Sequence, residues 1–160
     1  MVYKTIISID DLKNNLNNDD FLIFDSRCDI KDSGYGIDSY TEGHIPNSIF
    51  VDVDTDLASE KRPGTGRHPL PDPNSFSEKL SHWGMSNNKQ VVVYDDAGGA
   101  FAGRLWWMLK WLGHEAVAVL DGGVNSWVKE GNKLVTTPTV FEKAHFEPCV
   151  QENMIATVED

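Results

Sequence analysis

The segment VVVYDDAGGAFAGR, residues 91–104, has the composition of a strand, a tight loop and the beginning of a helix. Its loop opens with Asp95 and Asp96 and continues through Gly98 and Gly99. A loop of this kind directs backbone amides toward the N-terminus of the following helix, where an anion is stabilised. The loop contains no Cys, Ser or Lys and therefore no nucleophile. Carboxylates already stand at this anion site, and we expect them to cap the helix.

Two arginines accompany aspartates at the ends of apolar runs. Arg104 could steer an anionic substrate, but we expect it to pair with a carboxylate over the loop, from Asp95, Asp96 or another residue. Arg27 follows Asp25 closely, and we expect a local ion pair at that turn.

Two histidines are candidate site residues. His44 lies between Gly43 and Ile45, just before an apolar run. It could move a proton, but a lone histidine is more often a satisfied polar group, and we expect it to hydrogen-bond the local backbone. His68 belongs to the proline-rich stretch GTGRHPLPDP, where it could line a cleft or brace its own loop.

The two cysteines, Cys28 and Cys149, form no CxxC pair, and no histidine cluster has the spacing of metal ligands, so no metal site is expected. No helix N-terminus follows Cys28, which we expect to be a small half-buried side chain rather than a nucleophile. Cys149 has no activating neighbour. Free thiols are typical of a reducing compartment, and there is no signal peptide or membrane-length apolar run, so we expect a cytoplasmic protein.

The composition favours one folded domain with a tail. The chain has 160 residues, of which 40% are hydrophobic, and it contains five tryptophans, enough material for a core. Its formal net charge of -11 disfavours nucleic acids and anionic membranes as partners, because both are polyanions. A small anionic substrate is not excluded, since a local site can be positive on an acidic protein.

Short apolar runs alternate with helical patterns, which predicts an α/β domain with a mainly parallel sheet. Strands are expected at 21–25, 48–52, 91–94 and 116–120, and helices after Ser8, from Ser75 to Gly84, over 101–112 and around Trp127. Residues 26–48 are expected to be mostly loop, and the connection 54–73 is long enough to form a wall of a site. Asp25, Asp95 and Asp121 end strands at the sheet edge where ligands bind.

The pattern changes after Gly131. We place a domain in residues 1–135 and a linker in 136–160, because the latter has no clear core pattern and contains two prolines. The apolar pair Met154-Ile155, followed by residues 157–160, resembles the start of a further domain.

Five motifs occur in an order and at spacings that resemble the rhodanese (thiosulfate/3-mercaptopyruvate sulfurtransferase) domain over about residues 8–131. They are Asp25-Ser-Arg27, Tyr40-Thr-Glu-Gly-His44-Ile-Pro46, Arg67-His-Pro-Leu-Pro71, the 94–104 loop with Trp106-Trp107, and Leu120-Asp-Gly-Gly123 with Trp127. More narrowly, they resemble the N-terminal, non-catalytic domain of a tandem sulfurtransferase. The resemblance implies a three-layer α/β fold. It also implies that Asp95 stands where a catalytic domain has its loop cysteine, so that a carboxylate fills the amide cradle but cannot accept sulfur.

The resemblance implies a reaction in which a cysteine of a second rhodanese domain takes sulfur from a small anionic donor and passes it on as a persulfide. No metal or organic cofactor is then needed. This half would contribute a cleft wall through His44, the 67–71 loop with His68, and Arg27, with Asp96 and Arg104 as further candidates. The chain alone would be inactive. The apolar surface around Trp106 and Trp107 would face the second domain, and an isolated chain could form a homodimer through it.

Two other interpretations stay open. The chain could be a stand-alone, catalytically dead rhodanese module with a binding or regulatory role. It could also be a phosphatase relative on the same scaffold, although the absence of a cysteine from the 95–104 loop argues against that reading.

Overall fold

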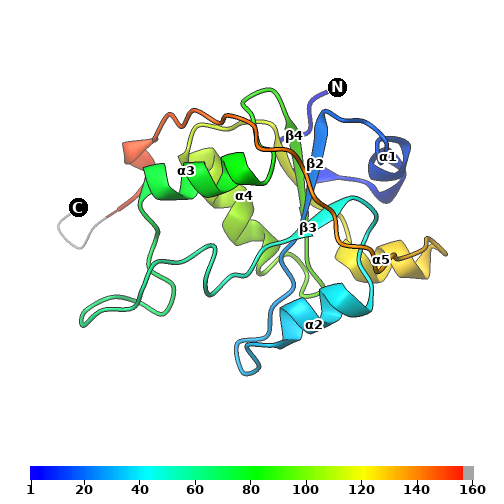
Figure 1. Cartoon of the computed structure of the whole chain (residues 1–160), viewed down its shortest axis with the longest axis horizontal. Coiled ribbons are helices and arrows are strands. Elements are labelled where there is room, and N and C mark those ends of the chain that lie inside the picture. The colour runs from blue at the N-terminus through cyan, green and yellow to red at the C-terminus, as the bar shows by residue number, and fades with distance from the viewer. Residues whose placement is uncertain (157–160) are drawn as a thin grey trace.

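A computed structural model describes residues 1–156, in which helices cover both faces of a central sheet (Figure 1). Five strands pair in the order β1-β5-β4-β2-β3, and every pairing in the described part of the chain is parallel. The predicted α/β class, its three layers and its parallel sheet are therefore confirmed. The strands are β1 (Ile6–Ile7), β2 (Phe21–Asp25), β3 (Ser48–Phe50), β4 (Gln90–Tyr94) and β5 (Val117–Leu120).

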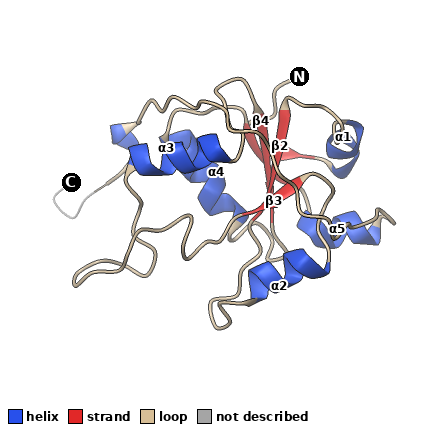
Figure 2. Ribbon diagram, in the orientation of Figure 1, coloured by secondary structure: helices blue, strands red, loops and turns tan. Residues whose placement is uncertain are grey.

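In Figure 2, α3 and α4 lie on one side of the strands, and α1 and α5 lie on the other. No helix within residues 1–156 combines the length and the apolar character that a membrane crossing requires. The helices are α1 (Ile9–Asn14), α2 (Tyr35–Glu42), α3 (Pro73–His82), α4 (Ala102–Trp111), α5 (Gly123–Lys129) and the short 3-10 helix η1 (Glu152–Met154).

Side chains of the central strands alternate between two cores. In β2, Leu22 and Phe24 pack in the core with residues of α3 and α4, whereas Ile23 packs with residues of α1 and α5. Strand β4 alternates in the same way, with Val93 on one face and Val92 on the other. A strand that is buried on both faces is apolar without interruption, which explains why these strands were predictable.

Two elements escaped the prediction. Residues 26–48 are mostly loop, as expected, but they also contain helix α2, which was not predicted. This helix begins after Gly34 without a side-chain cap and buries only Gly36 and Tyr40, so it lacks both a start signal and an apolar stripe. Strand β1 has two residues and lies at the edge of the sheet, where it pairs with β5. A run of two residues is too short to show the pattern of a strand.

The beginning of α3 also needs correction. The expected start at Ser75 is wrong, because the helix begins at Pro73 and its N-cap is Asp72, whose carboxylate accepts a hydrogen bond from the amide of Ser75 at 2.9 Å. Proline in the first turn is favoured because its missing N–H would have no intrahelical partner there. The first helix begins after Ser8, as expected, with Ser8 as its N-cap, and Gly113 follows the end of α4 with a φ of +80°.

The segment after α5 lies along the domain. Phe146 is 3% exposed, and the amides of Cys149 and Gln151 each donate a 2.8 Å hydrogen bond to carbonyls at the C-terminal end of α4. The predicted domain boundary at residue 135 stays a prediction. Residues 157–160, which entered the prediction of a further domain, lie outside the described residues.

Candidate functional site

The loop between β4 and α4 closes around the side chain of Asp95, a residue that is 2% exposed. Its Oδ1 accepts hydrogen bonds from the amides of Ala97 (3.0 Å) and Gly99 (2.9 Å). Its Oδ2 accepts from the amides of Phe101 and Ala102, each at 2.8 Å. Amides at a helix N-terminus form an anion site, and here the anion is the protein's own carboxylate. As expected, the cradle is filled by a group that cannot accept a sulfur atom.

Glycines allow the chain to take this shape. Gly98 and Gly99 have φ angles of +68° and +89°, a region that other residues rarely adopt. Gly123, at the start of α5, has φ +59°, and a Cβ atom there would lie 2.2 Å from the carbonyl oxygen of Asp95. That oxygen accepts the amide of Val124 at 3.1 Å, so the turn after β5 supports the loop after β4.

Arg27 forms the local ion pair that was expected. Its Nη2 lies 2.6 Å from Oδ2 of Asp25 and 2.7 Å from the carbonyl oxygen of Gly43, and its Nε donates to both carboxylate oxygens. Asp25 is fully buried and Arg27 is 7% exposed. Burial opposes the charged form, but the hydrogen bond and the charge of Asp25 raise the pKa of Arg27 above its ordinary value. The guanidinium of Arg27 is therefore held in the protein interior by these partners.

Tyr94, the last residue of β4, completes this buried network. Its hydroxyl donates to Oδ2 of Asp25 at 2.8 Å and accepts the amide of Ile45 at 3.1 Å. Burial and the charge of Asp25 raise the pKa of Tyr94 well above its ordinary value, so the phenol stays protonated. The network therefore connects the C-terminal ends of β2 and β4 to the turn before β3.

His44 is fully buried, and both ring nitrogens face backbone carbonyls. Nδ1 lies 2.7 Å from the oxygen of Tyr40, and Nε2 lies 2.9 Å from the oxygen of Thr137. The ring also stacks on that of Tyr40, with 3.7 Å between the centroids. The expectation that His44 hydrogen-bonds the backbone is confirmed. Both nitrogens are occupied, so the ring fastens the segment after α5 to the domain and has no free position for a substrate.

Within residues 1–156, Arg104 pairs with no carboxylate, so the predicted ion pair is wrong. Its Nε and Nη2 donate to the carbonyl oxygen of Leu57, at 3.1 and 2.7 Å, and Nη2 also donates to the oxygen of His68 at 2.9 Å. Burial lowers the pKa of Arg104 from its ordinary value. The acidic side chains of the loop already accept other hydrogen bonds. The connection between β3 and α3 supplies the carbonyl oxygens to which Arg104 donates instead. Arg104 thus holds the two sides of that connection together.

Replacing Arg104 by alanine should release this connection. We expect trypsin to cleave the bond between Lys61 and Arg62 roughly ten times faster in Arg104→Ala, because cleavage of a loop follows its local opening. A time course of limited proteolysis checks this, with Lys129→Ala on the exposed end of α5 as the control. An unchanged rate in Arg104→Ala would show that the connection is held by other contacts.

His68 and Asp96 are each held by a partner across the site. Nε2 of His68 lies 2.5 Å from Oδ1 of Asp54, so His68 braces its own loop while its side chain stays 18% exposed. The carboxylate of Asp96 accepts the hydroxyl proton of Tyr35 from α2. This hydrogen bond raises the pKa of Tyr35 above its ordinary value.

Cys28 is partly buried against the core, as expected, and has the environment of an inert thiol. Burial, together with the charges of Asp54, Asp52 and Asp29, raises its pKa to about 11. A thiol with that pKa is almost entirely protonated at neutral pH and is a poor nucleophile. Cys149 is exposed in the segment after α5.

Alkylation can test this assignment. At neutral pH we expect iodoacetamide to modify Cys149 at least about ten times faster than Cys28, because only the thiolate reacts and Cys28 is shielded. The Cys28 rate should then rise about tenfold for each pH unit until the pH approaches its pKa of about 11. Peptide mass spectrometry over time gives both rates. Equal rates at neutral pH would contradict the raised pKa.

The tryptophans of α4 divide between core and surface. Trp111 is 4% exposed and stacks on Trp107 with 6.0 Å between ring centroids. The indole nitrogen of Trp106 donates to the carbonyl of Lys4 at 3.0 Å, and the ammonium of Lys110 lies 5.7 Å from the Trp106 ring. Contact of this surface with a second domain or a second copy stays a prediction.

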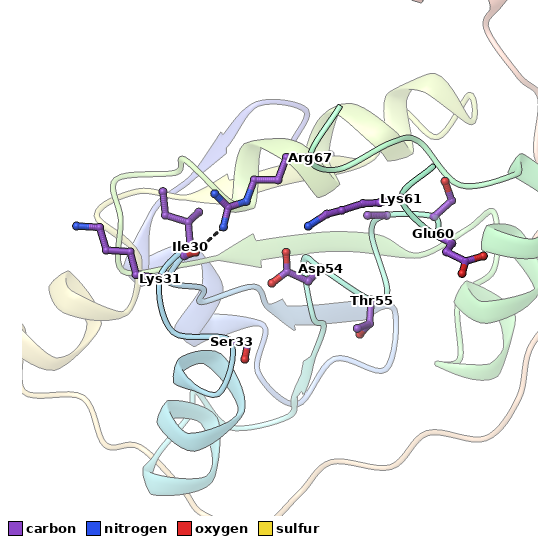
Figure 3. A pocket seen from close by; sticks show the side chains of 10 residues that line it. Ile30, Lys31, Ser33, Asp54, Thr55, Glu60, Lys61 and Arg67 are labelled. Carbon is purple, nitrogen blue, oxygen red and sulfur yellow. Dashed lines mark hydrogen bonds between the residues drawn. The ribbon is translucent and has the colours of Figure 1, made fainter. Parts of the chain in front are cut away.

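Sequence reasoning missed several residues that the fold brings to this edge of the sheet. Tyr35 lies in α2, within a range whose sequence pattern predicts mostly loop, and the pattern around Tyr94 indicates only the end of a strand. A cavity of about 540 Å³ opens between the turn at 30–33 and the connection after β3, lined among others by Asp54, Lys61 and Arg67 (Figure 3). In the sequence, the charged residues of the connection after β3 are the signal that could have indicated this cavity. Within residues 1–156, no three His, Cys, Asp or Glu side chains are grouped so that they could hold a metal ion.

Comparison with known proteins agrees with this geometry. The chain is 41% identical over 144 residues to the probable 3-mercaptopyruvate sulfurtransferase of Pseudomonas aeruginosa, covering 89% of this chain and 51% of that protein. It is 36% identical over 124 residues to the thiosulfate sulfurtransferase of Rattus norvegicus, covering 75% of this chain and 40% of that protein. The chain thus spans about half or less of the length of these relatives.

Solved structures share the fold. The 3-mercaptopyruvate sulfurtransferase of Leishmania major superposes with a TM-score of 0.80 at 30% identity, covering 92% of this chain and 42% of that one. SseA of Escherichia coli superposes with a TM-score of 0.83 at 26% identity, covering 98% of this chain and 60% of that one. The model of the rhodanese-like domain matches residues 8–130. With the parallel sheet and the loop after β4 as described, the chain belongs to the rhodanese-like domain family.

Proposed function

We propose that this domain is the non-catalytic half of a two-domain sulfurtransferase, in which a cysteine of a second rhodanese domain performs the chemistry. The observation that carries the proposal is the carboxylate of Asp95, which accepts hydrogen bonds from four backbone amides in the loop and at the start of α4. A sulfur carrier at that loop must be a thiolate. The thiols of this chain lie elsewhere, at Cys28 after β2 and at Cys149 after α5.

The comparisons support the reaction class and the division into halves. The similar proteins from Pseudomonas aeruginosa and Rattus norvegicus are named as sulfurtransferases for 3-mercaptopyruvate and thiosulfate. The aligned regions account for 51% and 40% of their lengths, which leaves room in those proteins for a further domain.

The proposed reaction has two displacements. The cysteine thiolate attacks the outer sulfur of thiosulfate; a sulfur–sulfur bond forms, and sulfite leaves with the electron pair of the broken bond. With 3-mercaptopyruvate, the carbon–sulfur bond breaks instead, and the pyruvate enolate takes up a proton. An acceptor thiolate or cyanide then attacks the outer sulfur of the persulfide and releases the cysteine thiolate. Oxidation states balance, so no redox cofactor takes part.

Within this domain, the connection after β3 is the part suited to form the cleft wall. His44 and Arg27 were expected to share that role, but both are buried and hydrogen-bonded to the interior. His68 is partly exposed and is held in one orientation by Asp54. An imidazole oriented by a carboxylate can act as a general acid, which suits the protonation of a leaving enolate.

A sulfur-transfer assay tests the proposal. The 160-residue chain is incubated with thiosulfate or 3-mercaptopyruvate and cyanide, and its intact mass is measured for an added sulfur atom. We expect neither turnover nor a persulfide. Turnover, or one sulfur atom on Cys28 or Cys149, would show that this domain is itself the catalyst.

A second measurement addresses the partner domain. An antibody to this chain captures the native protein from cells, and mass spectrometry reads its length and sequence. A longer polypeptide with a second rhodanese domain and a cysteine in the loop after the corresponding strand supports the proposal. A native polypeptide of 160 residues would favour the stand-alone binding module instead.

A further inference from the structure

The segment after α5 is attached to the domain at two places. Near α2, His44 and Val135 exchange two backbone hydrogen bonds of 2.9 Å, and the amide of Thr139 donates to the hydroxyl of Tyr40 at 3.3 Å. Farther along the chain, amides between residues 144 and 151 donate to the C-terminal ends of α3 and α4. We call the contact of residues 135–139 with Tyr40 and His44 the near attachment. Because it has hydrogen bonds of its own, it can open locally while the rest of the domain stays folded.

The ring of His44 lies in the near attachment and faces more acceptors than a neutral imidazole can satisfy. Its Nδ1 is 2.7 Å from the carbonyl oxygen of Tyr40, and its Nε2 is 2.9 Å from the carbonyl oxygen of Thr137. A neutral imidazole has one N–H, and its other nitrogen presents a lone pair. One of the two carbonyls would then face a lone pair at hydrogen-bond distance, which is repulsive. The imidazolium, with two N–H groups, donates to both carbonyls.

His82 shows the simpler arrangement within the same domain. Its Nδ1 lies 2.8 Å from the carbonyl oxygen of Glu78, four residues before it, just as Nδ1 of His44 faces Tyr40. The ring of His82 is exposed, so water can serve its other nitrogen as donor or acceptor. His44 is fully buried and has no such choice. The second carbonyl, from Thr137, is therefore what makes a proton on His44 matter for the segment.

The surroundings of His44 offset part of the cost of burying a charged ring. The ring stacks on that of Tyr40 with 3.7 Å between the centroids, and the face of a tyrosine ring attracts a cation. From the end of β2, the guanidinium of Arg27 donates to the carbonyl oxygen of Gly43, but its charge is balanced by Asp25 at 2.6 Å. The other titratable groups of the elements around the ring are the buried phenol of Tyr94 and the exposed side chains of Asp38, Glu42 and Lys133.

We propose that His44 is a proton-dependent latch for the segment after α5, in which the imidazolium fastens residues 135–139 to α2 and loss of its proton loosens them. The ring holds its second proton best when both carbonyls are in place, so proton binding and attachment favour each other. Lowering the pH therefore tightens the near attachment, and raising the pH loosens it. Under the proposed function this segment leads toward the second domain, and the latch then sets how firmly the two halves are tied; the latch itself does not require that function.

Nitrogen-15 NMR of the 160-residue chain counts the protons on the ring. Spectra are recorded between pH 5 and pH 8, the range in which imidazole side chains ordinarily change charge. The signals that disappear in His44→Gln belong to His44. We expect both of its ring nitrogens to carry a proton at the acidic end of this range. A single neutral tautomer at every pH would overturn the latch.

Amide hydrogen exchange measures the attachment itself. After correction for the intrinsic exchange rate at each pH, the protection of the Val135 and Thr139 amides is divided by that of Val92 in β4. We expect this ratio to be at least about tenfold higher at pH 5 than at pH 8, because the attachment gains a hydrogen bond from a charged group. In His44→Gln the ratio should change less than about twofold over the same range, because glutamine takes up no proton.

His145→Gln is the matched control. His145 is an exposed imidazole of the same segment, 3.0 Å from a carboxylate oxygen of Glu147, and its loss should leave the pH dependence of the ratio intact. A pH dependence that persists in His44→Gln would assign the effect to another group and overturn the latch, as would a ratio independent of pH in the unchanged chain. If His44→Gln does not fold, the profile of the unchanged chain and that of His145→Gln still decide. The proposed function survives each of these failures, because it depends on turnover and persulfide formation.

Discussion

Asp95→Ala should lower the free energy of unfolding by about 3–5 kcal/mol, because it leaves four amide donors at the start of α4 without their acceptor. The expected cost is less than four full penalties, since water can enter part of the opened loop. Asp95→Asn should cost about half as much, because one oxygen remains to accept while the new amide group faces two N–H donors. Urea unfolding followed by tryptophan fluorescence measures all three proteins.

Asp121→Ala is the matched control. Asp121 also ends a strand, but its side chain is exposed and accepts no hydrogen bond within the described part of the chain. Its loss should change the unfolding free energy by less than about 0.5 kcal/mol, as at most surface positions. If Asp95→Ala came within about 1 kcal/mol of the unchanged protein, water would be able to replace the carboxylate, and Asp95 would not be the centre of the loop.

Arg27→Leu should destabilise the domain by about 3–5 kcal/mol, because it leaves the fully buried carboxylate of Asp25 without its counter-charge. The double variant Asp25→Leu with Arg27→Leu should recover about 1–3 kcal/mol of that loss, because both buried charges are removed together. The hydroxyl of Tyr94 then loses its acceptor, which keeps the recovery incomplete. Denaturant unfolding of the two single variants and the double variant gives the coupling energy.

Lys79→Ala provides the surface comparison for this cycle. The ammonium of Lys79 lies 2.8 Å from a carboxylate oxygen of Asp56, but both side chains are partly exposed to water. Its removal should cost less than about 1 kcal/mol. Additive effects of the Asp25 and Arg27 substitutions would contradict the interpretation of their contact as a coupled buried pair.

The local sequence pattern was sufficient to predict a contact wherever the partners of a residue are close in sequence. Strand β4 has an uninterrupted apolar run because both of its faces are buried, and the loop after it closes on amides within seven residues of Asp95. The Asp25–Arg27 pair spans two residues and was also predicted. In such cases the sequence specifies both the buried group and its partner.

Hydrogen-bond partners that are distant in sequence cannot be predicted from a local pattern. Arg104 was expected to pair with a carboxylate over the loop, but its acceptors are carbonyl oxygens 47 and 36 residues away, because the nearby carboxylates already had partners. His44 reaches Thr137 across 93 residues. A pattern shows that a polar group must be satisfied, but the packing of other segments decides which acceptor is nearest.

The sequence by itself therefore determined the parallel α/β fold, the membership of the rhodanese-like family and the absence of a nucleophile from the loop after β4, because each follows from contiguous residues. Only the tertiary structure decided that Arg27 and His44 are enclosed, that Arg104 holds the connection after β3, and that Lys61 and Arg67 meet at one cavity. Those outcomes depend on how separate loops pack at the edge of the sheet, where chain segments distant in sequence compete for the same hydrogen-bond partners.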